Sequence, residues 1–228
     1  MPARKADPTR PAKKAILIVD DHPMLRRGLT SLIDSEPDLA VCGEASTCAA
    51  ALQAIRQRKP DVVIVDIGLE GRDGLELVKD MKVQHPKIPA LVLSMHDESL
   101  YAERALRAGA RGYATKQQID DTVLIAIRRL LSGEMYLSEK IGARFAANFL
   151  GGRTLQEDSP LAVLTDRELE VFLLIGQGRG TRQIAQSLHL SIKTIESYRE
   201  HLKQKLTLES GAELVRRATE WVESGRTR

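Results

Sequence analysis

Short apolar runs alternate with amphipathic stretches from Ala15 to about Gly133. The runs have three to six residues and several are rich in β-branched side chains, which is typical of strands buried on both faces of a sheet. The predicted strands are Ile16–Val19, Leu39–Val41, Val62–Val65, Ile88–Leu93 and Gly112–Ala114. Apolar positions with a helical period predict helices at Met24–Ile33, Ala49–Arg58, Leu75–Val83, Leu100–Ala108 and Val123–Leu131. Five such units predict an α/β fold, a doubly wound five-stranded parallel sheet with helices on both faces.

The rest of the chain has no strand signal and predicts a second, small all-α domain. Four short helices are predicted there, at 166–176, 181–188, 192–206 and 211–223, and the stretch before it, 138–149, is a candidate for another helix. Thr165 and Glu168 match the capping box of a helix start, and Leu164 and Leu169 are placed for a hydrophobic staple. We expect a disordered basic tail at 1–14, a first domain at 15–134, a linker with a helix at 135–160, and the second domain at 161–228.

Composition excludes several classes of protein. The chain has 228 residues, 43% of them hydrophobic and 29% charged, as expected for a globular protein with its own core. Cys42 and Cys48 have no metal or redox spacing and argue against a disulfide framework, so we expect a cytoplasmic, reducing environment. No apolar run approaches the roughly 18 residues of a membrane helix, and the tail lacks the apolar core of a secretory signal. A net charge of +3 is too small to indicate nucleic acid by itself.

Chemistry-bearing residues lie at the predicted strand ends, where open parallel sheets bind their ligands. Asp20 and Asp21 follow the first strand, and Asp66 ends the third. Ser94 ends the fourth strand, and Lys116 follows the fifth. Any one of these residues could simply cap a helix or face solvent. The ordered set predicts one rim with three carboxylates, a hydroxyl and an amine.

This rim is suited to phosphoryl chemistry. Clustered carboxylates repel one another unless a cation intervenes, and Mg²⁺ takes carboxylates together with phosphate oxygens. An ionised Asp beside Mg²⁺ is a competent nucleophile toward a phosphoryl group. A Lys and a Ser then suit the oxygens of the resulting phosphate.

The same residues carry a resemblance to the flavodoxin-like receiver domain of two-component response regulators. The matching stretches are Ile16–His22, Val62–Ile67, Leu91–Met95 and Gly109–Lys116. The resemblance implies that Asp66 accepts a phosphoryl group from a sensor histidine kinase. It further implies a Mg²⁺ site formed by Asp20, Asp21, Asp66 and the carbonyl of Gly68. Ser94 and Lys116 would bind the phosphate, and Tyr113 would be an aromatic switch.

One departure from the family pattern keeps an alternative function open. Glu70 stands four residues after Asp66, where the family usually has Pro. Its charge favours a second hypothesis, in which the receiver is a protein-interaction module that works without phosphorylation.

A phosphohydrolase needs an acid/base Asp two residues after its nucleophile, and Gly68 stands there instead. We therefore expect no enzyme activity. Tyr113 could also be a packed aromatic residue rather than a switch.

The second domain contains two helices joined by a tight turn at His189–Ser191. Ala185 is small enough for close helix packing, and Ser191 can cap the second helix. Its expected inner face consists of Ile192, Ile195, Leu202 and Leu206. This is the helix-turn-helix pattern, whose second helix enters the major groove of DNA. Spacing alone is equally compatible with a small bundle whose polar face is solvated.

A second resemblance favours DNA binding. Leu164–Val171, Gly176–Gly178, Ser191–Ile195 and Lys205–Leu206 look like the LuxR-type DNA-binding domain, and with a receiver they indicate the NarL/FixJ class. The resemblance implies phosphate or groove-edge contacts by Lys193, Thr194, Arg199 and Lys203, and base contacts by Glu196, Ser197 and Glu200. Gly180 departs from the family, since relatives often have Ser there, so the start of the helix at 181 is expected to fray.

The last predicted helix would supply a dimer interface by the same resemblance. Val215 and Ala218 are candidate contacts, although packing within the monomer explains each equally well. Trp221 is expected to anchor the core. The sequence therefore predicts a phosphorylation-gated DNA-binding transcription regulator that binds double-stranded DNA as a homodimer.

Overall fold

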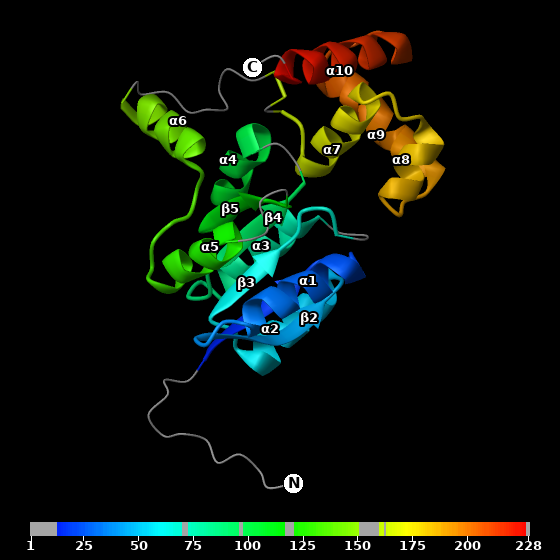
Figure 1. Cartoon of the computed structure of the whole chain (residues 1–228). Helices are drawn as coiled ribbons and strands as arrows, with labels where there is room; N and C mark the ends of the chain where they lie inside the picture. Colours follow the sequence, from blue (N-terminus) through cyan, green and yellow to red (C-terminus); the bar gives the residue numbers. More distant parts are fainter. Residues whose placement is uncertain are drawn as a thin grey trace, which may run out of the picture. The chain divides into compact units, whose positions relative to one another are not determined.

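A computed structural model describes residues 13–69, 73–95, 98–116, 121–150, 160–161 and 163–226. The chain forms two compact units, and the second consists mainly of residues from Glu139 onward (Figure 1). The predicted tail lies outside the described residues except for Lys13 and Lys14, and Lys14 already belongs to the first strand. Most of the stretch after residue 150, up to Pro160, also lies outside them, as do Glu70 and Gln117.

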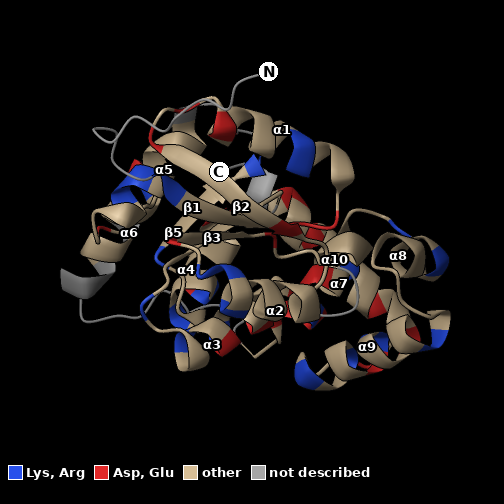
Figure 2. Cartoon of the chain, turned by 90° about the horizontal axis from the view of Figure 1, so that it is seen from below, with Lys and Arg blue, Asp and Glu red and all other residues tan. Residues whose placement is uncertain are grey.

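The first unit is a parallel sheet with the strand order β2-β1-β3-β4-β5. Its strands are β1 Lys14–Val19, β2 Leu39–Ala45, β3 Val62–Val65, β4 Ala90–Ser94 and β5 Gly112–Thr115. Its helices are α1 Pro23–Asp34, α2 Cys48–Arg58, α3 Gly74–Gln84, α4 Glu98–Ala108 and α5 Asp121–Leu131. Figure 2 shows α1 and α5 on one face of the sheet and α2, α3 and α4 on the other. The predicted doubly wound fold is confirmed.

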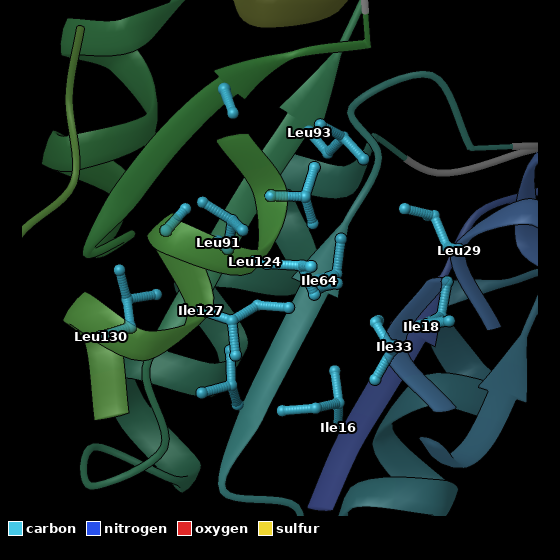
Figure 3. Packing of buried hydrophobic residues seen from close by; sticks show 14 of the residues in the cluster. Ile16, Ile18, Leu29, Ile33, Ile64, Leu91, Leu93, Leu124, Ile127 and Leu130 are labelled. Atoms are coloured by element: carbon cyan, nitrogen blue, oxygen red, sulfur yellow. The ribbon is translucent and has the colours of Figure 1, made fainter. Parts of the chain in front are cut away.

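The core between the sheet and the helices α1 and α5 consists of aliphatic side chains (Figure 3). Ile16 and Ile18 of β1 and Ile64 of β3 are at most 1% exposed. They pack with residues of α1 and α5 that include Leu29, Ile33, Leu124, Ile127 and Leu130. Burying such a side chain stabilises the fold by about 1.5–3 kcal/mol, so this face fixes the strands whose ends carry the polar residues.

Strand β2 is longer than the sequence indicates. The expected strand ends at Val41, whereas the observed pairing with β1 continues to Ala45. The register shifts between Ile16 and Leu17, so that Cys42 has no partner and Gly43 pairs with Leu17. Gly43 and Glu44 are weak strand formers, and tertiary pairing overrides their local preference.

The second unit is helical, as predicted. Its elements are α6 Glu139–Leu150, α7 Asp166–Gly176, α8 Thr181–Ser187, α9 Ile192–Lys205 and α10 Gly211–Arg226. The capping box of α7 is confirmed, since Thr165 N donates to Glu168 Oε2 at 2.8 Å and Glu168 N donates to Thr165 Oγ1 at 3.3 Å. Leu164 and Leu169 are both buried, as expected for the staple.

Helices α8 and α9 are joined by the expected tight turn. Gly180 N donates to Gln183 Oε1 at 2.8 Å, a bond that opposes fraying at the N-terminus of α8. His189 in the turn has a φ of 51°, and Ser191 caps α9 by accepting from Thr194 N at 3.0 Å. These contacts fix the direction in which α9 leaves the turn.

Candidate functional sites

The order of the strands places Asp20 and Asp66 side by side, because β1 and β3 are neighbours and each residue directly follows its strand. Backbone bonds hold both positions: Asp20 N donates to Ala45 O at 3.0 Å, and Asp66 N donates to Val19 O at 2.8 Å. The two residues are 2% and 4% exposed. The structure thus holds two carboxylates in the crevice at the switch in strand order.

Lys116 follows β5 and reaches across to both carboxylates. Its Nζ lies 2.7 Å from Asp20 Oδ2 and 2.7 Å from Asp66 Oδ2. The Lys116 side chain is 5% exposed. One buried ammonium group therefore balances two buried carboxylates, which is a costly arrangement for stability and is characteristic of functional sites.

The pKa of Asp66 is raised above its ordinary value. Burial is the main cause, and the negative charge of Asp20 acts in the same direction. Lys116 and the Gly68 backbone N–H oppose the shift by stabilising the charged form. Additional positive charge at this position would favour the ionised, nucleophilic carboxylate.

Asp21 and His22 complete the acidic rim. Nδ1 of His22 lies 2.7 Å from Asp21 Oδ1, 3.2 Å from Asp20 Oδ1 and 3.9 Å from Asp66 Oδ2. One ligand atom from each of these four residues lies within 4.8 Å of the others. In the described part of the chain, Asp21 Oδ1 is buried and accepts no hydrogen bond, although His22 approaches it. Oxygen donors at this spacing fit a divalent cation.

Sequence reasoning missed two residues of this rim. His22 ends the stretch Ile16–His22, and the resemblance implies no role for it. Arg26 of α1 donates through Nη1 to the backbone carbonyl of Asp20 at 2.6 Å and pairs with Glu44 at 3.0 Å. The only sequence signal for Arg26 is its position one helical turn after His22.

Ser94 and Tyr113 lie on the neighbouring strands β4 and β5. Ser94 is fully buried and pairs in register with Thr115, the residue before Lys116. Tyr113 is 1% exposed, and its backbone N–H donates to Tyr136 O at 3.0 Å. The tyrosine ring is therefore packed inside the protein, and its role as a switch stays a prediction.

Helix α9 carries every residue expected to contact DNA. It presents both signs of charge along its length (Figure 2). The exposed residues are Lys193, Glu196, Ser197 and Glu200. The half-buried ones are Thr194, Arg199 and Lys203. Some of these side chains already have partners within the helix, since Lys203 pairs with Glu200 at 2.8 Å and the Thr194 hydroxyl lies 2.8 Å from Ser191 Oγ.

The expected inner face of α9 is correct for Ile195 and Leu202, which are fully buried, and Leu206 is half-buried. It is wrong for Ile192, whose side chain is 43% exposed. Ile192 is the first residue of the helix and borders an open hollow shared with Arg182 of α8. The first turn of α9 therefore presents an apolar side chain beside the polar ones.

Helix α10 packs tightly on α7. A Cβ added at Gly176 would lie 2.3 Å from the backbone oxygen of Ala218. Ala218 is fully buried, Trp221 is half-buried, and Val215 is 40% exposed. Of the two candidate dimer contacts, Ala218 is therefore occupied within the unit and Val215 is accessible.

Comparisons with known proteins identify the family of each unit. Residues 16–128 match the response regulator receiver domain, and residues 162–218 match the bacterial regulatory proteins of the luxR family. The oxygen regulatory protein NreC of Staphylococcus haemolyticus is 33% identical over 204 residues, which cover 88% of this chain and 94% of that protein. NreC of Staphylococcus aureus is 34% identical over the same shares. The chain therefore belongs to the two-component response regulators with a LuxR-type DNA-binding domain.

Solved structures give the same assignment. A LuxR-family response regulator from Aurantimonas sp. is 32% identical, with a TM-score of 0.57 over 61% of this chain and 99% of that one. The RcsB response regulator of Salmonella typhimurium is 25% identical, with a TM-score of 0.54 over 91% of this chain and 98% of that one. Among the helices of the described residues, none combines the length and apolar character needed to span a bilayer.

Proposed function

We propose that Asp66 is the phosphoacceptor through which a sensor histidine kinase controls DNA binding by α9. The observation that carries this proposal is the geometry around Asp66, a buried carboxylate beside a second carboxylate with one buried ammonium group on both. Few purely structural sites bury this much charge. The family membership of the chain supports the same role.

The transfer forms one bond and breaks another. An ionised oxygen of Asp66 attacks the phosphorus of a phosphohistidine, the P–N bond breaks, and the imidazole leaves with its electron pair and takes up a proton. The product is an acyl phosphate on Asp66. The Lys116 ammonium is placed to offset the charge of the phosphoryl oxygens, and the Ser94 hydroxyl would donate to one of them. A shift of the Tyr113 ring would transmit the phosphorylation of Asp66 to the rest of the sheet.

The donors fit Mg²⁺, since Asp20, Asp21 and Asp66 offer carboxylate oxygens within 4.8 Å of one another. Asp21, Asp66 and the Gly68 carbonyl would hold the ion, with Asp20 assisting. When bound, Mg²⁺ supplies positive charge that screens the phosphoryl oxygens and the nucleophile.

The output is sequence-selective DNA binding. Lys193, Arg199 and Lys203 would contact phosphates, while Glu196 and Glu200 would face base edges, where a carboxylate accepts from cytosine N4. A solved RcsB structure, 25% identical with a TM-score of 0.55, contains two dimers bound to two DNAs. We infer that this chain likewise binds double-stranded DNA as a homodimer once phosphorylated. We propose that the protein acts in the cytoplasm, where DNA and the proposed kinase would be available.

A second candidate function rests on Glu70, whose charge replaces the family's usual Pro near the acceptor. In that account, the receiver is a docking module and DNA binding does not depend on phosphorylation. The two functions differ in one observable, which is the occupancy of Asp66 by phosphate.

The test is treatment of the full chain with a small acyl-phosphate donor and Mg²⁺, followed by intact mass. Wild type should gain one phosphoryl mass, Asp66→Asn should gain none, and Asp80→Asn, a control on α3, should behave as wild type. Labelling of Asp66→Asn would contradict the assignment. Absence of labelling in wild type, with DNA binding intact, would favour the docking module.

A further inference from the structure

His22 is the rim residue to which the proposed function assigns no role. It follows Asp20 and Asp21 and precedes α1, and its backbone N–H donates to Asp20 Oδ1 at 2.7 Å. Its side chain is 67% exposed, yet Nδ1 faces the buried acids rather than solvent. The imidazole therefore approaches the acidic rim from its open side.

The two oxygens of Asp20 have different neighbours. Oδ2 contacts Lys116, while Oδ1 lies 3.2 Å from Nδ1 of His22. Lys116 and His22 thus lie near different oxygens of the same carboxylate. Lys116 also contacts Asp66 Oδ2, and the outer side of the rim is defined by Asp20 Oδ1, Asp21 Oδ1 and Nδ1 of His22.

The spacing on the outer side matches a coordination shell. Nδ1 lies 2.7, 3.2 and 3.9 Å from carboxylate oxygens of Asp21, Asp20 and Asp66. Ligands about 2.1 Å from an ion are about 3.4 Å apart in a tetrahedral site and about 3.0 Å apart at neighbouring octahedral positions. The observed distances bracket both values, so a small shift of the exposed ring would let one ion contact the nitrogen and the acids.

We propose that Nδ1 of His22 is a metal ligand, so that the rim prefers first-row transition ions such as Co²⁺ and Zn²⁺ to Mg²⁺. The inference rests on the metal site of the proposed function and adds a nitrogen donor to it. Mg²⁺ favours oxygen ligands and keeps its waters, whereas imidazole is a favoured ligand of Zn²⁺ and its neighbours. A neutral imidazole has one nitrogen lone pair to donate, and the other nitrogen stays toward solvent.

The test is calorimetric titration of the full chain with Mg²⁺, Co²⁺ and Zn²⁺ chloride, together with the visible absorption of Co²⁺. His22→Asn removes the nitrogen donor. It should raise the Kd for Co²⁺ and Zn²⁺ by about tenfold or more and change that for Mg²⁺ by less than about threefold. The Co²⁺ absorption bands should shift as a nitrogen is replaced by oxygen.

His189→Asn is the matched control, because His189 is an exposed histidine of the second unit whose φ of 51° Asn tolerates. It should bind all three ions as wild type does. Equal Co²⁺ and Zn²⁺ binding by His22→Asn and wild type would overturn the proposal. So would a parallel loss of Mg²⁺ binding, since His22 would then only orient Asp21.

Asp21→Asn separates this inference from the proposed function. If Mg²⁺ binding survives Asp21→Asn, the magnesium site assigned above is wrong. The role of His22 is then still decided by the Co²⁺ titration of His22→Asn. Thermal unfolding midpoints of all variants, measured without metal, confirm that each is folded.

Discussion

The ammonium group of Lys116 lies 2.7 Å from a carboxylate oxygen of Asp66, and both side chains are 5% exposed. A second carboxylate, that of Asp20, lies at the same distance from the ammonium. The proposed phosphoryl transfer requires Asp66 to be ionised and reachable, and Lys116 makes the ionised form tolerable in a buried position. The same contact holds the end of β5 against the ends of β1 and β3, so that the site and the sheet are stabilised together.

Lys116→Met should therefore destabilise the first unit. It leaves two buried carboxylates without a cation, and breaking a buried ion pair costs about 3 kcal/mol or more. The measurement is urea unfolding at pH 7 followed by circular dichroism. Lys79→Met, which removes a surface partner of Glu76, is the control and should cost less than about 1 kcal/mol. Equal stability of Lys116→Met and wild type would contradict the role given to Lys116.

Gly176→Ala should destabilise the second unit by about 1–3 kcal/mol. The added methyl group would meet the backbone oxygen of Ala218 at 2.3 Å and a methyl of Val222 at 2.6 Å. Helices α7 and α10 would have to separate. Gly211→Ala is the control, since nothing lies within 4 Å of its Cβ position, and it should be neutral or slightly stabilising. Calorimetric unfolding of both variants measures the difference, and similar midpoints would refute tight packing at Gly176.

The Glu168–Lys205 ion pair, 2.7 Å long, should make the second unit sensitive to acid. Burial acts to raise the pKa of Glu168, but Lys205 and Thr165 hold this pKa below its ordinary value. A lowered pKa in the folded state contributes stability above the unfolded value of about 4.3, and that stability is lost as the pH falls through the folded value. Acid unfolding should therefore begin below about pH 4.3.

Lys205→Met tests that sign. Removing the cation raises the pKa of Glu168, so the acid unfolding midpoint should move to higher pH. Stability at pH 7 should fall by about 1 kcal/mol, because Lys205 is partly exposed and its charge is screened. An unchanged acid midpoint would show that Thr165 alone stabilises the carboxylate.

Two substitutions on α9 should affect DNA binding in different ways. Lys193→Ala removes an expected phosphate contact, so the slope of log K against log salt should fall by about 1 for each bound protomer, with base preference unchanged. Glu196→Ala should keep the slope and relax the preference at one base pair by about 1–3 kcal/mol. Selection from random DNA and salt titrations measure both. A loss of base preference in Lys193→Ala would reverse the assigned roles.

The sequence predicted the α/β fold because buried strands such as Val62–Val65 and amphipathic helices have strong, separate periodicities. It placed Asp20, Asp66 and Lys116 correctly because strand order follows from a few topological rules. The sequence-based prediction is wrong where packing against neighbouring elements decides whether a side chain is buried. The periodicity of α9 assigns Ile192 to the inner face, but that face is not covered at the first turn of the helix.

The predicted length of β2 is wrong for a related reason, and the sequence predicts no role for His22. Gly43 pairs with β1 despite a poor strand propensity. His22 faces the acids because the loop after β1 turns its ring toward them, and a loop conformation of this kind leaves no periodic signal in the sequence.

Control of DNA binding by phosphorylation at Asp66 can be measured by fluorescence anisotropy with labelled DNA from a random-pool selection. Full-length wild type and Asp66→Asn are titrated with and without the acyl-phosphate donor and Mg²⁺, and each sample is also analysed by sedimentation. The donor should lower the Kd of wild type for DNA by about tenfold and promote its dimerisation, with no effect on Asp66→Asn. An equal response of both proteins, or no change in wild type that carries the phosphoryl mass, would contradict it.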